Sequence, residues 1–249
     1  MTLTIWLCVY FFFISSALTW LAMPASGVLG AKFGMMDHPG DRKVHGNPIP
    51  LTGGLILFGV FGLVLFAHGL VVMSMDVKSM GGVSPGLAAF SRGLPGVWER
   101  LAWMLIAALS IFGLGLADDR FGLRVRTRLL LQFGAATLSV CGGVQPAFEG
   151  VPVLIGWIIC IFWVVTIINA FNMVDGLDGL AGGLGLIASL LMAASLLMTS
   201  QSQGAIVLAC LSGCLVGFLR FNAHPAKVFM GNSGAMTLGL VLGSMTLYL

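Results

Sequence analysis

The sequence predicts an all-α fold, a polytopic membrane helix bundle with about eight transmembrane helices. Composition is the first observation: 58% of the 249 residues are hydrophobic and 8% are charged, whereas a soluble domain carries about 25% charged residues. Mean hydropathy is +1.03. The second observation is a series of eight apolar runs, the longest of which reach the ~20 residues that cross a bilayer. An ordinary soluble domain is excluded, and we treat residues 1–249 as a single integral-membrane domain.

The apolar runs cover residues 3–23, 55–75, 101–117, 129–143, 151–168, 184–198, 205–219 and 235–249. The first run is predicted to be a retained helix. A signal peptide is the alternative, but no Lys or Arg precedes the run, and a signal core is usually about 7–15 residues long. The last run ends the sequence without a polar tail, so we expect a chain that is truncated at its C-terminus.

Four polar segments separate these runs, and their spacing predicts the topology. Residues 32–54, 118–128, 169–183 and 220–234 are each two spans apart, which places all four on the same side of the membrane. Nine of the 12 Lys and Arg residues fall in these segments. Because cytoplasmic loops are enriched in Lys and Arg, we expect the segments in the cytoplasm and the N-terminus outside.

The stretch 169–183 carries two amides and two carboxylates at membrane depth. Asn169, Asn172, Asp175 and Asp178 recur at every third residue. On a helix this spacing drifts by about 60° per step, so neighbours lie close on one face. Ionisable groups in the bilayer are costly, which makes the stretch a candidate functional site. A polar loop between two spans is the alternative.

A second candidate site follows the third run. Two adjacent carboxylates, Asp118 and Asp119, precede four arginines within residues 120–128. This pattern suits a cation beside a phosphate. A positive-inside anchor is the alternative, and it explains the arginines but not the aspartate pair. The five cysteines show neither Cys-x-x-Cys nor zinc spacing, so we interpret them as packing residues.

Four motifs resemble the polyprenyl-phosphate N-acetylhexosamine-1-phosphate transferases, in particular the bacterial undecaprenyl-phosphate GlcNAc-1-phosphate transferases. They are DHPGDRKVH (37–45) with PLTGG (50–54), DDR (118–120), NAFNMVDGLDG (169–179) and KVFMG (227–231). They occur in the family's order, two spans apart. Together the motifs extend over essentially the whole chain.

The resemblance implies a reaction in the bacterial cytoplasmic (inner) membrane, with the active site facing the cytoplasm. A lipid phosphate, undecaprenyl phosphate, would attack the β-phosphorus of a UDP-N-acetylhexosamine such as UDP-GlcNAc and release UMP. The product would initiate an O-antigen type, lipopolysaccharide-linked glycan. Mg²⁺ is the implied cofactor, with Mn²⁺ as a substitute, since both reactants are anions. We expect no nucleic-acid partner, and a homodimer is one option for the oligomeric state.

The resemblance also implies residue roles. It assigns catalysis to Asp118 and Asp119, metal binding to Asn172, Asp175 and Asn232, and substrate binding to Lys43, His45, Arg128, Asn169, Asp178 and Phe229. One of the two catalytic aspartates would act as base toward the lipid phosphate. Phe229 occupies a position where an aromatic ring stacks on uracil, and Arg128 one where a basic residue holds phosphate.

The sequence departs from the family at two points. Relatives carry Asp where this chain has Asn232, and an amide ligand brings no charge to Mg²⁺, so we expect weakened metal binding and low activity. The chain also ends before the family's His-rich cytoplasmic loop. Three alternatives therefore remain: an inactive partner of an intact relative, a transporter or flippase, and a family member whose substrate is a muramyl-pentapeptide. Polar residues at mid-span, which a transporter needs, are missing from the sequence.

Overall fold

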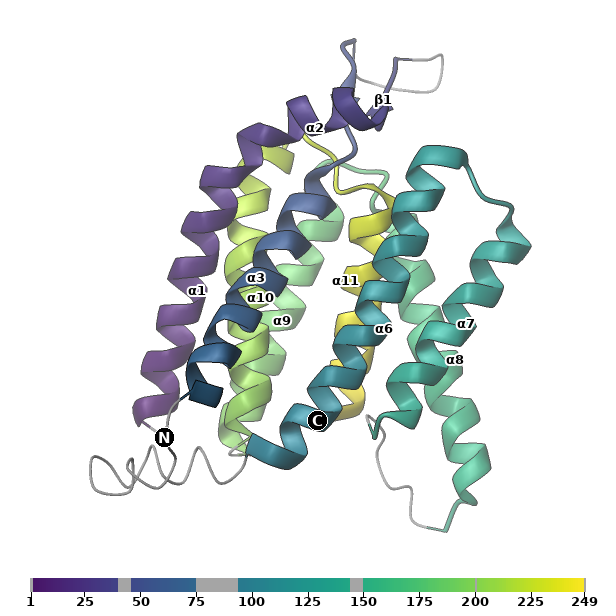
Figure 1. Cartoon of the computed structure of the whole chain (residues 1–249). Helices are drawn as coiled ribbons and strands as arrows, with labels where there is room; N and C mark the ends of the chain where they lie inside the picture. Colours follow the sequence, from purple (N-terminus) through teal and green to yellow (C-terminus); the bar gives the residue numbers. More distant parts are fainter. Residues whose placement is uncertain (1, 40–45, 75–93, 144–149, 200, 249) are drawn as a thin grey trace.

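The computed structural model describes residues 2–39, 46–74, 94–143, 150–199 and 201–248, and these form a bundle of long helices (Figure 1). The helices of 17 residues or more in this part of the chain are α1 (Thr2–Ala22), α3 (Gly53–Ser74), α6 (Leu94–Phe121), α7 (Val125–Cys141), α8 (Val153–Val174), α9 (Leu180–Met198), α10 (Ser202–Asn222) and α11 (Gly231–Tyr248). A 3₁₀ turn (Met23–Ala25) and the short helix α2 (Ser26–Phe33) extend α1. The prediction of about eight helices is confirmed.

Within the described ranges, six helical segments are long and apolar enough to cross a membrane. The chain is therefore a multi-span membrane protein. The two other long helices differ for identifiable reasons. Helix α7 has 17 residues and carries Arg126 and Arg128 near its start, and α11 has 18 residues and opens on Gly231, Asn232 and Ser233.

Successive long helices alternate in direction, so the four polar segments meet at one end of the bundle. In Figure 1 this is the upper end, where α2, β1 and the connections α6–α7, α8–α9 and α10–α11 lie, whereas both chain ends lie at the lower end. This arrangement agrees with the parity argument from the sequence. The end of the bundle that contains these connections is called the polar end below.

Helix α10 forms the centre of one half of the bundle and packs between α1 and α9. Glycines allow α1 to approach its backbone: a Cβ on Gly213 would lie 2.1 Å from the Phe12 carbonyl oxygen, and one on Gly217 would lie 2.6 Å from the Ser16 carbonyl oxygen. A buried hydrogen bond of 2.7 Å between Ser189 and Ser212 joins α9 to α10. Close packing and polar pairs of this kind hold membrane helices together.

Helix α11 forms the centre of the other half and packs chiefly against α6 and α8. Its side chains from Ala235 to Met245 are almost all buried. Gly115 of α6 permits the approach at the polar end, because a Cβ there would lie 2.2 Å from Ser233 Cα. The start of α11 therefore packs closely against the last turn and a half of α6.

A small backbone ribbon closes the polar end. Strands β1 (Met36–Asp37) and β2 (Ile49–Pro50) pair antiparallel. The segment before α11 extends this ribbon: Phe229 N–H donates to the Pro50 carbonyl (2.9 Å), and Gly53 N–H donates to the Phe229 carbonyl (3.0 Å). Residues 229–231 are thus fixed between the ribbon and the start of α3.

Most helix ends lie a few residues from the predicted ends, and the largest differences concern α6, α8 and the two short strands. Helix α6 begins at Leu94 rather than near residue 101, since Pro95 suits a first helical turn and a helix can extend beyond its apolar span. Helix α8 continues to Val174, past the predicted end at residue 168. The two short strands were not predicted, because two-residue strands leave no periodic pattern in a sequence.

Candidate active site

A pocket of about 820 Å³ opens among the four polar segments at the polar end. Its lining residues are Asp37, Ile49, Leu51, Asp119, Asn172, Asp175, Gly176, Leu177, Asp178, His224, Pro225, Ala226, Phe229, Gly231 and Asn232. The ends of α6 and α8, the connection that follows α10 and the start of α11 all contribute. One part of the pocket is rich in carboxylates and amides, and another is apolar. The pocket therefore suits a ligand that has both a charged and a flat apolar portion.

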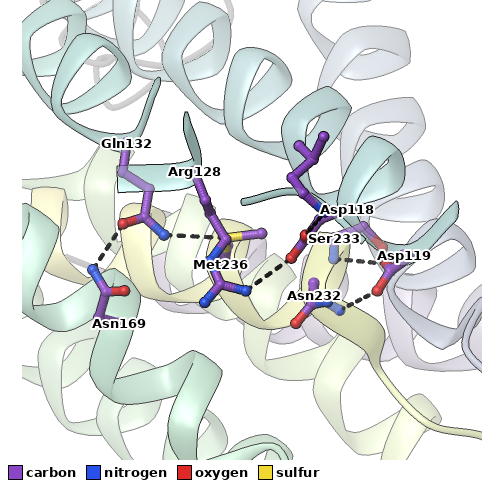
Figure 2. A network of polar contacts seen from close by, with 9 residues as sticks. Asp118, Asp119, Arg128, Gln132, Asn169, Asn232, Ser233 and Met236 are labelled. Atoms are coloured by element: carbon purple, nitrogen blue, oxygen red, sulfur yellow. Dashed lines mark hydrogen bonds and ion pairs between the residues drawn. The ribbon is translucent and has the colours of Figure 1, made fainter. Parts of the chain in front are cut away.

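Asp119 links two helices at the charged part of the pocket (Figure 2). It lies in the last turn of α6, and its two carboxylate oxygens accept N–H bonds from Asn232 (2.8 Å) and Ser233 (3.0 Å) at the start of α11. The first N–H groups of a helix have no partner within the helix, and the helix dipole favours a negative charge there. Asp119 of α6 therefore caps the N-terminus of α11.

Asp175 is the second carboxylate at the same helix start. It lies directly after α8, with the backbone N–H of Gly231 nearby. Burial, and after it the negative charge of Asp119, raise the pKa of Asp175 well above its ordinary value, while the nearby Gly231 N–H opposes that shift. Gly231, Asn232 and Ser233 thus place two like charges close together, and such a pair favours a bound cation.

Two amides complete this part of the pocket. Asn172 lies one turn before Asp175, and its Oδ1 atom is buried without a hydrogen-bond partner. A buried amide oxygen without a partner is costly, and it is a donor of the kind that Mg²⁺ accepts. Asn232 lines the pocket beside Asp119. The described residues contain no cluster of three or more His, Cys, Asp or Glu side chains in metal-binding geometry, so the oxygen donors here are two carboxylates and two amides.

The α8–α9 turn is tied to the α10–α11 connection across the pocket. Asp178 Oδ2 accepts the Ala226 N–H at 3.0 Å and lies 2.9 Å from Nδ1 of the exposed His224. Asn222, which is 3% exposed, accepts the Gly179 N–H (3.1 Å) and donates to the Val228 carbonyl (3.0 Å). These bonds fix one segment of the pocket wall against the other.

Phe229 lies on the apolar part of the pocket. Both its N–H and its carbonyl are bonded to the segment 50–53, so its backbone is fixed while its ring lines the pocket with Ile49 and Leu51. Stacking of the Phe229 ring on uracil stays a prediction, and the position of the ring is consistent with it.

Three predicted residues, Asp118, Arg128 and Asn169, do not line the pocket. Asp118 lies beside Asp119, but its carboxylate bonds to Arg128 and to the Leu123 N–H instead. Asn169 donates to the Gln132 side chain (2.8 Å) and to the Val165 carbonyl, and Gln132 donates in turn to Met236 Sδ (Figure 2). The expectation that 169, 172, 175 and 178 share one helical face therefore needs correction, because α8 ends at Val174 and Asn169 faces α7.

Two further predicted substrate-binding residues, Lys43 and His45, lie outside the described residues. Sequence reasoning missed Asn222, Gln132 and His224. No spacing rule identifies them, because each acts through a partner that is distant along the chain. A polar residue within an apolar run, as Gln132 is, was the available signal for one of the three.

Comparison with known proteins gives the family and the relatives that this sequence matches. The sequence model of Glycosyl transferase family 4 matches residues 101–249. The decaprenyl-phosphate N-acetylglucosaminephosphotransferase of Mycobacterium tuberculosis is 34% identical over an alignment that covers 92% of this chain and 57% of the relative. The probable undecaprenyl-phosphate N-acetylglucosaminyl 1-phosphate transferase of Bacillus subtilis is 33% identical over 94% of this chain and 61% of the relative.

A third relative matches a shorter region. The phospho-N-acetylmuramoyl-pentapeptide-transferase of Nitratiruptor is 51% identical over 43 residues, which are 17% of this chain and 12% of the relative. The chain spans 57–61% of the length of the Mycobacterium tuberculosis and Bacillus subtilis relatives. The family match covers more than half of the chain, and it includes every helix that contributes a carboxylate to the charged part of the pocket. The chain therefore belongs to Glycosyl transferase family 4.

Proposed function

We propose that this chain transfers a sugar-1-phosphate, GlcNAc-1-phosphate in the first instance, from a UDP-sugar to a polyprenyl phosphate such as undecaprenyl phosphate. One observation carries the proposal: two carboxylates and two amides converge at the polar end of a membrane bundle that aligns along most of its length with relatives named as polyprenyl-phosphate N-acetylglucosamine phosphotransferases. At this position a lipid phosphate in the bilayer and a water-soluble nucleotide can both reach the same pocket.

In the proposed reaction, an oxygen of the lipid phosphate forms a bond to the β-phosphorus of the donor. The bond between that phosphorus and the bridging oxygen breaks, and the electron pair leaves with UMP. Phosphoryl transfer of this kind depends mainly on positioning and on charge stabilisation. Asp119 and Asp175, held by the N–H groups of α11, define where the charged part of the donor binds.

The donor set at the pocket fits a hard divalent cation. Asp119, Asp175, Asn172 and Asn232 would hold Mg²⁺, or Mn²⁺ in its place, and the unpartnered Oδ1 of Asn172 is the observation that supports this fit. When bound, the ion would neutralise the diphosphate of the donor. The apolar part of the pocket at Phe229 would take the flat uracil, and the Asp178–Ala226 and Asn222 bonds would keep that wall in place.

The comparisons favour a GlcNAc donor over a muramyl-pentapeptide donor. The phosphotransferases named for N-acetylglucosamine align over more than nine-tenths of this chain, whereas the muramoyl-pentapeptide transferases align over about a fifth of it or less. We propose that the product starts a lipid-linked cell-surface glycan in a bacterial cytoplasmic membrane, with the pocket facing the cytoplasm.

Release of UMP tests the proposal. Membranes that contain the chain would receive UDP-GlcNAc, undecaprenyl phosphate and Mg²⁺, and we expect UMP to form only when all three are present. Asp119→Asn should lower the rate by at least about a hundredfold, because a charged oxygen that would hold the divalent cation is lost. Arg100→Gln, which removes an exposed charge at the opposite end of α6, is the matched control and should keep the wild-type rate.

An Asn232→Asp variant tests the weakest part of the donor set. A third carboxylate beside Asp119 should tighten Mn²⁺ binding by roughly tenfold, since hard cations prefer charged oxygen, and it should raise the rate. Equal Mn²⁺ affinities in the two chains would show that the amide suffices. If neither chain releases UMP but the chain co-purifies with a full-length relative, the alternative of a non-catalytic partner is favoured instead.

A further inference from the structure

Asp118 and Asp119 are neighbours in sequence, but the structure gives their carboxylates different surroundings. Consecutive residues on a helix point about 100° apart, so the two side chains leave α6 in different directions. Asp119 lines the pocket and bonds to α11. Asp118 is 6% exposed, and the described lining of the pocket does not include it.

Both carboxylate oxygens of Asp118 are engaged in the turn between α6 and α7. Oδ1 accepts the Leu123 N–H at 2.8 Å, and Oδ2 lies 3.0 Å from an Arg128 guanidinium nitrogen in α7 (Figure 2). Its backbone carbonyl also accepts the N–H of Gly122, whose positive φ of 62° lets the chain reverse direction. Asp118 thus joins the end of α6, the turn and the start of α7.

This arrangement fixes the last turn of α6, which would otherwise fray as helix ends do. Asp119 belongs to the same turn. Its two bonds to Asn232 and Ser233 form only if the turn keeps the orientation that points the Asp119 side chain at α11. A charged pair with little exposure is strongly disturbed when one partner is removed, because the other charge is left without compensation.

We propose that Asp118 is a positioning residue and not a catalytic one: together with Arg128 it holds the α6–α7 turn so that Asp119 stays bonded to the start of α11. The inference rests on the proposed function only in that the pocket beside Asp119 is taken as the reaction site. The position of Asp119 itself can be measured without any turnover.

Hydrogen exchange gives the direct test. In the full chain in detergent or nanodiscs, the amides of Asn232 and Ser233 would be followed in the peptide that contains them. Asp118→Asn should speed their exchange by roughly tenfold, because the loss of a charge-assisted bond frees Asp119. Arg128→Gln should do the same, and the double variant should be no worse than the more affected single variant, since both changes break one contact.

The affinity for Mn²⁺ distinguishes a positioning role of Asp118 from a role in stabilising the fold alone. Measured below the unfolding temperature, Mn²⁺ affinity should fall by about three- to tenfold in Asp118→Asn, whereas a residue that only stabilises the fold would leave it unchanged. Thr127→Ala is the matched control, because Thr127 is exposed beside Arg128 on α7, and it should leave both measurements at their wild-type values.

Two results would overturn the proposal. The first is wild-type exchange and wild-type Mn²⁺ affinity in Asp118→Asn together with abolished UMP release, which would make Asp118 a group that touches the reacting atoms. The second is wild-type behaviour in every measurement. Failure of the proposed function looks different: the unaltered chain would neither bind Mn²⁺ nor release UMP, while the exchange measurement would still decide the role of Asp118.

Discussion

At the residue scale, the charged part of the pocket is held together by backbone N–H groups of α11. Asp119 lies at the end of α6 and accepts the N–H groups of Asn232 and Ser233, and Asp175 follows α8 with the Gly231 N–H nearby. The arrangement keeps two negative charges close without a basic side chain among the lining residues of the described chain other than His224. Burial and the neighbouring charge of Asp119 raise the pKa of Asp175.

The pH dependence of stability follows from this raised pKa. The folded chain binds the Asp175 proton more tightly than the unfolded chain, whose pKa is near the ordinary 3.8. The contribution of Asp175 to stability is therefore present in full below about pH 4 and is lost as pH rises through the raised pKa.

Asp175→Asn removes this loss of stability at high pH, because the amide stays neutral at every pH. In cation-free buffer the variant should unfold at about the wild-type temperature at pH 4 and a few degrees above it at pH 8, given roughly 2–4 °C per kcal/mol for a chain of this size. Thermal unfolding at the two pH values is the measurement. A difference between variant and wild type that does not change with pH would contradict the raised pKa.

At the element scale, the bundle depends on close approach between helix backbones. Helix α1 meets α10 at Gly213 and Gly217, and α6 meets α11 at Gly115. These glycines let the helix backbones approach closely beside the buried apolar side chains, as is usual between helices in lipid.

Gly217→Ala should therefore destabilise the α1–α10 contact. A Cβ at this position would lie 2.6 Å from the Ser16 carbonyl oxygen and 2.8 Å from Thr19 Cβ, and overpacking of this kind costs about 1–3 kcal/mol. Gly134→Ala on α7 is the control: nothing lies within 4 Å of its Cβ position, so the variant should gain up to about 1 kcal/mol from helix propensity. Unfolding in a denaturing detergent titration measures both, and equal effects would contradict the close contact.

At the scale of the whole molecule, the alternation of helices sets the two ends of the bundle apart. Thr127 lies at the polar end, and Cys141 lies at the other end of the same helix (Figure 1). Both side chains are exposed. This pair allows the proposed orientation in the membrane to be tested with one helix.

A membrane-impermeant maleimide should label Cys141 in intact spheroplasts. A Thr127→Cys variant in a Cys141→Ser background should react only in inverted vesicles. The three buried cysteines should stay unlabelled in both preparations, and so should the half-buried Cys8. The opposite pattern of labelling would place the pocket outside the cytoplasm.

Much of this architecture could be predicted from the sequence, because apolar run length determines helix number and the parity of the runs determines which connections share an end. The pocket at the ends of α6, α8 and α10 followed from the same parity. The separate roles of Asn172 and Asn169 did not follow. Both lie in α8 with the same chemistry, and only the packing of Gln132 against Asn169 distinguishes them. Likewise, adjacency in sequence did not show that Asp118 and Asp119 face different partners.

The start of α11 also determines the order in which the pocket can be assembled during synthesis. Asp119 precedes its partner Asn232 by 113 residues, so at roughly 5–20 residues per second the ribosome takes several seconds to supply it. Gly231 is likewise synthesised after Asp175. Until α11 inserts between α6 and α8, both carboxylates stand at the membrane edge without these donors. The insertion of one late helix therefore converts a set of inserted spans into a formed pocket.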